Sequence, residues 1–425
     1  MADKKHVRFF LGSNTKRGFV SLFDELKDPA DGKKLYIIKG GPGSGKSSLM
    51  KRVIKTLERK NHNIEFFHCA SDPDSLDAFI DNDAKIALVD GTAPHIMDPD
   101  YPGAYDNIIN MADCWDTKKL SESKPEIIKL SNTISSCHRM ASSCILAAAA
   151  LLDNNMQTAG AYINHEIADN FIENIVKELE GCQKGKEKKR LLSAVSVGRI
   201  VFFDDTIPHL ASKVYVLPDK WGAASDLVLS KINQAAAFMN LERITCYCSV
   251  RTPDKIDHII FPSIGIAITT SNDFHPVKDT GRNTVNNLLL DIPKTEQEQM
   301  SLHLQKAKEL TGLACEHIKR AKLLHDELEA IYIDAMDFSK VDAIYEKLIN
   351  ERIQRKKIFE SEREQILKEN RDIQREIADI EKDLSSIDDK NQWSQDEVKQ
   401  LQKKINELTT QREHLTSDLT ELKVQ

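Results

Sequence analysis

A glycine-rich segment in the first fifty residues has the residue types and spacing that bind phosphate. It fits the pattern G-x-x-x-x-G-K-[ST], and the predicted nucleotide-binding residues are Gly40, Gly41, Pro42, Gly43, Ser44, Gly45, Lys46, Ser47 and Ser48. Glycines let backbone amides turn inward around phosphate oxygens, and the N-terminus of a following helix adds partial positive charge. We expect Lys46 to span the β- and γ-phosphates of ATP, and the Ser47 hydroxyl to coordinate Mg²⁺.

An aspartate at the end of an apolar run would complete the magnesium site. Residues 85–90 read Lys-Ile-Ala-Leu-Val-Asp, so Asp90 closes a predicted strand. Phosphate-loop enzymes place a carboxylate near Mg²⁺ at such a position. Ser47 and Asp90 are therefore the predicted metal-binding residues. The alternative is that Asp90 only caps the next turn.

The residue that would activate water is less obvious. Gly91 follows Asp90, where a glutamate would be the usual base. We predict catalytic roles for Lys46, Asp90 and His95, because an imidazole can accept a proton near neutral pH. A structural role for His95 stays open. The other acidic side chains within reach along the sequence are Asp72, Asp74, Asp77 and Asp98.

The first 350 residues contain an internal repeat with an offset near 180 residues. Residues 64–95 align without a gap to residues 244–275, and His95 aligns with His275. The site residues are replaced in the second copy: Ser225 stands for Lys46, Asp226 for Ser47 and Thr270 for Asp90. A phosphate would also meet Asp219 there. We predict that the second copy does not bind nucleotide with magnesium.

A strand before the glycine-rich segment and a helix after it must position the site. The apolar run 35–38 predicts the strand, and residues 47–57 predict the helix. Strands alternate with helical segments in both copies, which is typical of an α/β fold with a mainly parallel sheet. We predict two P-loop NTPase-like parallel-sheet halves with helical additions, an active half at 1–185 and a degenerate half at 190–350. The basic run 183–190 is interpreted as a solvated linker.

The C-terminal region predicts a long helical structure. No glycine or proline follows Gly312, and isoleucine and leucine recur at heptad spacing. The two series are Ile366, Ile373, Ile377, Ile380, Leu384 and Ile387, then Val398, Leu401, Ile405, Leu408, Leu415, Leu419 and Leu422. Residues 388–393 break the register, and residues 394–397 have the form of a capping box. We predict an antiparallel α-helical coiled-coil hairpin at 351–425, with one long helix in a parallel dimer as the alternative.

The overall composition excludes several classes of protein. Apolar residues make up 40% of the 425 residues and charged residues 29%, enough to bury a core. A net charge of −7 does not favour dedicated nucleic-acid binding. The longest apolar run, 144–152, is too short to span a bilayer, and the first residues lack a signal peptide. The eight cysteines include no Cys-x-x-Cys pair, and we interpret Cys246 and Cys248 as buried thiols. We expect a cytoplasmic protein with no membrane association.

Several motifs together resemble an uncharacterised family of bacterial tandem P-loop ATP-binding proteins. The motifs are residues 10–15, residues 90–95 with Asp98-Pro99 and 102–104, and residues 332–338. The resemblance covers about residues 8–350. It implies a P-loop NTPase fold and ATP binding through Gly45, Lys46 and Ser47, but no established substrate. Relatives often carry a second P-loop, which this chain lacks.

Three functions fit these patterns. The first is an ATP-binding protein that acts as a slow Mg²⁺-dependent ATPase or an ATP-driven switch, through a protein partner or self-association of the coiled coil. The second is a small-molecule or nucleotide kinase, which the absence of arginine from residues 61–138 disfavours. The third is a non-hydrolysing scaffold that ATP stabilises. ATP and Mg²⁺ are the expected cofactors.

Overall fold

The structure is a computed structural model that describes residues 7–58, 62–248, 250–251, 253–277, 283–385 and 395–424. The chain divides into two compact units. Unit 1 contains Met1–Lys27 and Lys34–Val341, and unit 2 contains Asp28–Lys33 and Asp342–Gln425. Both copies of the sequence repeat therefore belong to unit 1.

The first copy forms a six-stranded sheet with one reversed strand. Its spatial order is β1 (Val7–Phe9), β5 (Ile64–His68), β6 (Leu76–Asp81), β7 (Ile86–Asp90), β4 (Lys34–Lys39) and β8 (Asp106–Asn110). Strand β6 runs antiparallel to both β5 and β7, whereas the other pairs are parallel. Three of the five strand pairs are parallel and two are antiparallel, so the sheet is mixed rather than parallel throughout. The connections at 69–75 and 82–85 are too short for the crossover that a parallel neighbour needs.

The second copy repeats this topology strand for strand. Its sheet has the order β9 (Glu187–Leu191), β13 (Arg243–Tyr247), β14 (Ile256–Phe261), β15 (Ile266–Ser271), β12 (Lys213–Pro218) and β16 (Asn283–Thr284). Strand β14 is the reversed strand, at the position that β6 holds in the first sheet. Each copy also has a small antiparallel hairpin, β2 (Gly12–Thr15) with β3 (Gly18–Ser21), and β10 (Ser193–Val195) with β11 (Ile200–Phe202).

The predicted linker between the copies is part of the second sheet. Strand β9 pairs in parallel with β13, so the second copy begins before residue 190. Arg190 is buried, lies over the Phe67 ring of the first copy and approaches Glu65 to 3.8 Å. Phe10 and Leu191 exchange backbone hydrogen bonds of 2.8 and 3.0 Å. The solvated-linker interpretation is wrong here, because basic side chains with long aliphatic stems can pack against apolar rings.

Helices cover the sheets and link the two copies. Those of unit 1 are α1 (Lys46–Glu58), α2 (Thr117–Glu122), α3 (Lys124–Gly160), α4 (His165–Glu178), α5 (Thr206–Leu210), α6 (Ala223–Phe238) and α7 (Lys294–Asp334). Short 3₁₀ turns are η1 (Phe23–Leu26), η2 (Pro29–Asp31), η3 (Met111–Cys114), η4 (Leu179–Gly181) and η5 (Pro262–Ile264). A shared apolar core contains side chains of both copies, among them Phe9, Leu35, Val214 and Ile260.

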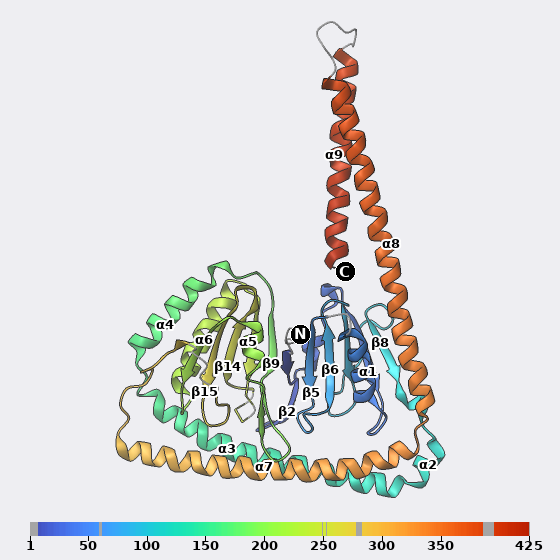
Figure 1. Ribbon diagram of the computed structural model, residues 1–425. Coiled ribbons are helices and arrows are strands. Elements are labelled where there is room, and N and C mark those ends of the chain that lie inside the picture. The colour runs from blue at the N-terminus through green and yellow to red at the C-terminus, as the bar shows by residue number, and fades with distance from the viewer. Residues whose placement is uncertain are drawn as a thin grey trace. The chain divides into compact units, whose positions relative to one another are not determined.

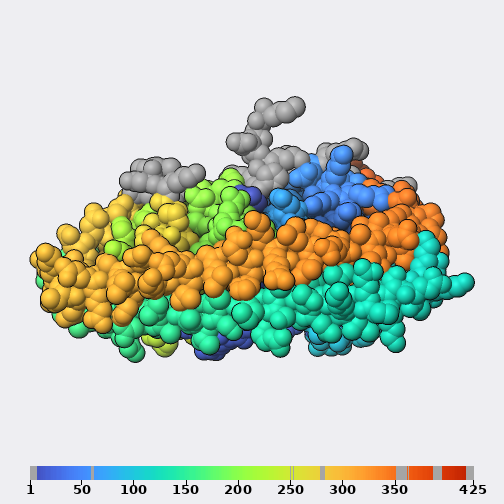
Figure 2. Space-filling model, turned by 90° about the horizontal axis from the view of Figure 1, so that it is seen from below, coloured from blue at the N-terminus to red at the C-terminus, as the bar shows by residue number. Residues whose placement is uncertain are grey.

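The long helices α3 and α7 run side by side beneath both sheets (Figure 1). Seen from below, they cover one face of unit 1 (Figure 2). Their contact buries alanines and branched residues such as Ala141, Ile145 and Ile318. Buried Asn155 of α3 donates to the Met300 carbonyl at 2.8 Å and pairs with His303 at 2.9 Å. Such buried polar pairs fix the register of two helices.

Helix α3 also has the length and apolar composition that could cross a membrane, as no other helix does among the residues described. The uninterrupted apolar run 144–152 is shorter than a membrane span, whereas the whole helix of 37 residues meets the criterion. Core helices of soluble proteins meet the same criterion. Packing buries one side of α3, including Ala141, Ile145 and Ala148, whereas Met140 and Leu146 are exposed.

Unit 2 contains two further helices, α8 (Phe338–Ser385, which begins in unit 1) and α9 (Gln395–Val424). They pack through heptad positions, with Ile377, Ile380 and Leu408 buried at the centre. Lys404 Nζ lies 2.7 Å from Glu376, and Asn370 donates to Thr416 at 3.4 Å, so the helices are antiparallel within one chain. Helix α8 passes residue 350 without a break. The predicted register break at 388–393 and the start of the capping box lie outside the described residues.

Candidate nucleotide-binding site

The glycine-rich loop, residues 40–45, joins β4 to α1. Buried Ile37 and Ile38 fix the strand, and buried Leu49 and Met50 fix the first turn of the helix. Gly43 and Gly45 have φ of 64° and 84°, in the left-handed region that side chains disfavour. The spacing of glycines in the sequence thus corresponds to real turns of the backbone.

Lys46 and Asp90 come together at the end of neighbouring strands. In the parallel pair β4 and β7, Ile38 lies opposite Asp90. The Lys46 ammonium donates to the carbonyls of Gly40 (2.8 Å) and Gly41 (2.7 Å), and lies 3.6 Å from Asp90 Oδ2. The other carboxylate oxygen of Asp90 accepts from the Thr92 amide and hydroxyl. Asp90 therefore caps a turn with one oxygen and faces the loop lysine with the other.

The remaining predicted residues of the site are Pro42, Ser44, Ser47 and Ser48, and they differ in their contacts and exposure. The Ser47 Oγ accepts from the Leu76 amide at 3.0 Å, and the Ser44 hydroxyl donates to Gly41 O at 2.8 Å. Pro42 is half-buried in the loop, whereas Ser48 is exposed on α1. Ser47 is thus tied to the start of β6, and Ser48 faces solvent.

A buried Asp77–His95 pair lies beside the loop. Asp77 is in β6, and its Oδ2 is 3.3 Å from His95 Nε2. The His95 ring packs against Phe19 and Phe23, with centroids 5.2 and 4.5 Å apart. Burial raises the pKa of Asp77 to about 6; the nearby Asp90 adds to the rise, and His95 opposes it. Neither Asp77 Oδ2 nor His95 Nδ1 has a hydrogen-bond partner among the described residues.

The other acidic side chains considered from the sequence bond elsewhere. Asp98 pairs with Lys39 at 2.9 Å, and Asp72 lies 3.4 Å from Lys322 of α7. At Asp74 it is the backbone carbonyl that accepts from Lys51 Nζ, at 2.6 Å. Asp77 was one of several alternatives in the sequence, and its burial beside His95 distinguishes it. Perturbed carboxylates of this kind are concentrated at functional sites.

The C-terminal turns of α7 lie directly over the glycine-rich loop. A Cβ at Gly41 would lie 2.8 Å from the Tyr332 ring, and one at Gly43 would lie 2.6 Å from the Glu329 carbonyl. The Gly43 amide donates to Glu329 Oε1 at 3.4 Å. Sequence reasoning missed these residues because they lie nearly 290 positions away. The motif at 332–338 was the only signal, and it belongs to this contact.

The second copy fills the equivalent loop with its own side chains. Buried Asp219 accepts from the amides of Trp221 (3.1 Å), Gly222 (2.8 Å) and Ser225 (2.8 Å). The Arg251 guanidinium donates to the carbonyls of Leu152 and Trp221. The Asp219 carboxylate thus accepts hydrogen bonds from the amides that would otherwise face a phosphate.

Comparison with family models matches residues 20–81 to the Nephrocystin 3, N-terminal family. That family is associated with P-loop NTPase-like proteins, and the matched residues include the glycine-rich loop and α1. The match gives no direct support to the bacterial tandem family. No curated protein and no solved structure matches the chain.

Proposed function

We propose that the chain binds ATP with Mg²⁺ at the glycine-rich loop and acts as an ATP-driven switch with slow ATPase activity, through a protein partner. The observation that carries the proposal is the position of Lys46. Its ammonium lies at the start of α1, between loop carbonyls and Asp90 of the adjacent strand. The partial family match to residues 20–81 supports a P-loop NTPase-like half.

The residues present fit the predicted cofactors. The loop amides, the N-terminus of α1 and Lys46 would hold the phosphates, and Ser47 with Asp90 would hold Mg²⁺. Bound Mg²⁺ would supply charge neutralisation to the phosphates. The two nearest partners of Lys46 are carbonyl oxygens, which hold an ammonium less strongly than a phosphate would, so nucleotide binding would replace these two contacts.

The Asp77–His95 pair is the proposed base, in place of the glutamate that is missing after Asp90. With a pKa of about 6, Asp77 is mostly ionised at neutral pH and can accept a proton. His95 Nε2, 3.3 Å away, would orient this carboxylate and stabilise its charge. This assignment changes His95 from the base itself to the partner of the base.

Glu329 favours the switch over a simple scaffold. Its carboxylate accepts a hydrogen bond from the Gly43 amide, which is one of the loop amides that would hold a phosphate. Phosphate and Glu329 would compete for this amide, so nucleotide binding would displace the end of α7. Since α7 also packs along α3 beneath the second copy, displacement at the loop would reach that copy.

ATP turnover tests this proposal. Wild type should hydrolyse ATP slowly in the presence of Mg²⁺, and Lys46→Ala should not. Lys220→Ala, in the equivalent loop of the second copy, is the matched control and should retain wild-type turnover. Stimulation by cell extract would support a partner-driven switch; transfer of phosphate to a small acceptor would support the kinase alternative. ATP binding without hydrolysis, with and without cell extract, would contradict the ATPase and support the non-hydrolysing scaffold.

A further inference from the structure

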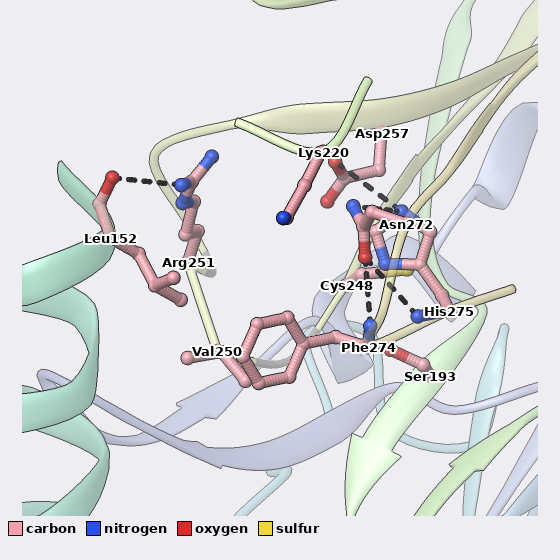
Figure 3. A pocket seen from close by; sticks show the side chains of 10 residues that line it. All are labelled: Leu152, Ser193, Lys220, Cys248, Val250, Arg251, Asp257, Asn272, Phe274 and His275. Atoms are coloured by element: carbon pink, nitrogen blue, oxygen red, sulfur yellow. Dashed lines mark hydrogen bonds and ion pairs between the residues drawn. The ribbon is translucent and has the colours of Figure 1, made fainter. Parts of the chain in front are cut away.

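Three metal-ligating side chains converge inside the second copy, away from the glycine-rich loop. Cys248 follows β13, His258 lies in β14 and His275 follows β15, so adjacent strands present them at one place. All three are buried, and one ligand atom from each lies within 4.8 Å of the other two. Cys248 and His275 line a small cavity (Figure 3).

His258 is oriented for ligation by its hydrogen bonds. The Thr269 hydroxyl donates to the Thr270 carbonyl, so its oxygen is left to accept from His258 Nδ1 at 2.5 Å. The lone pair of His258 Nε2 then faces Cys248 Sγ at 3.1 Å. Metal-binding histidines commonly have the second ring nitrogen fixed in this way.

His275 has polar contacts of its own. Its Nε2 lies 2.7 Å from the Thr270 hydroxyl and 3.0 Å from Asn272 Nδ2, so a metal bound at this nitrogen would replace these contacts. The Asp257 carboxylate, paired with Lys255, lies 3.8 Å from His275 Nε2. Two imidazoles, one thiol and a nearby carboxylate form a donor set suited to Zn²⁺.

A small cavity lies beside two of the three side chains, Cys248 and His275. Its volume is about 30 Å³, and Cys248, Asp257 and His275 are among its lining residues. A cavity of this size holds a water molecule but not an organic substrate. Three protein ligands and one water would complete a tetrahedral site.

We propose that Cys248, His258 and His275 bind one Zn²⁺ ion that joins the ends of β13, β14 and β15. Binding transfers the Cys248 S–H proton to solvent and forms the sulfur–zinc bond. The first copy serves as a comparison because it lacks one of the three ligands: Ala78 aligns with His258. Its equivalent cluster of Cys69, Asp77 and His95 has only one imidazole.

Metal uptake by the full-length chain, purified without a histidine tag, tests the site. After chelator treatment, wild type should take up one equivalent of Zn²⁺ or Co²⁺. The Co²⁺ form should show a tetrahedral d–d spectrum and a charge-transfer band from one thiolate. Cys248→Ser should lose the thiolate band, and His258→Ala should lose stoichiometric uptake. Cys69→Ser is the matched control and should keep both.

Two results would overturn the proposal. One is the absence of stoichiometric uptake by wild type, which would leave the cluster as a hydrogen-bond network. The other is loss of the thiolate band in Cys69→Ser with retention in Cys248→Ser, which would place the metal in the first copy. The wild-type cobalt spectrum decides the first result even if a variant fails to fold.

Discussion

Substitution of Asp77 by asparagine should stabilise the protein, and increasingly so as pH rises. Asparagine has nearly the same shape as the carboxyl group but carries no charge. Asp77 is buried, and burial raises its pKa from 3.8 to about 6. The native state therefore binds this proton more tightly than the unfolded state does. Stability from this group is complete below pH 3.8 and is lost as pH rises through about 6.

The size of the effect follows from the two pKa values. A rise from 3.8 to about 6 corresponds to about 3 kcal/mol of lost stability above pH 7, at about 1.4 kcal/mol per pKa unit. About half of this loss has already occurred at pH 5, because the unfolded-state carboxyl is ionised there. The advantage of Asp77→Asn over wild type should therefore grow by about 1.4 kcal/mol between pH 5 and pH 8.

Urea unfolding at pH 5 and pH 8, followed by tryptophan fluorescence, measures this difference. Asp98→Asn is the control, because Asp98 is exposed and Lys39 lowers its pKa. Because the Asp98 carboxyl is ionised at pH 5 in both the folded and the unfolded state, the effect of Asp98→Asn should be the same at both pH values. An advantage of Asp77→Asn that is the same at both pH values would refute the assignment. A buried carboxylate that lowers the stability of the protein is expected where it has a function.

Three further predictions concern α7, the degenerate loop and the C-terminal helices. Glu329→Gln should tighten ATP binding about two- to fivefold by removing a carboxylate from the Gly43 amide, as calorimetry would show; equal or weaker binding would count against competition. Asp219→Ala should destabilise unit 1 by about 1–3 kcal/mol in urea unfolding, since it leaves three buried amides unpaired; an unchanged midpoint would contradict this. Removal of 357–425 should leave ATP binding intact but alter the oligomeric state in light scattering or partner capture. Loss of ATP binding would make those residues part of the nucleotide site.

Local sequence patterns predicted the elements that hold the loop. Apolar runs placed β4 and β7, and the motif placed Lys46 at the start of α1. The heptad series placed the buried seam of α8 and α9. These features depend on residues close together in the chain, so periodicity and spacing determine them.

Features that depend on distant residues were not predictable in the same way. The reversed direction of β6 depends on two short connections, and the repeat alone could not give its direction. Glu329 and Tyr332 reach the loop only because a 41-residue helix ends there. The roles of Asp77 and Arg190 come from burial between elements, which no single sequence shows. Tertiary packing determines the surroundings of Asp77 and of Arg190.

The most direct test of the central claim is isothermal calorimetry of ATP binding with Mg²⁺. Wild type and Lys220→Ala should each bind one ATP per chain, and Lys46→Ala should show no measurable binding while keeping the wild-type circular-dichroism spectrum. Two ATP molecules per wild-type chain would contradict the degenerate second copy. Unchanged binding in Lys46→Ala would contradict the nucleotide site itself.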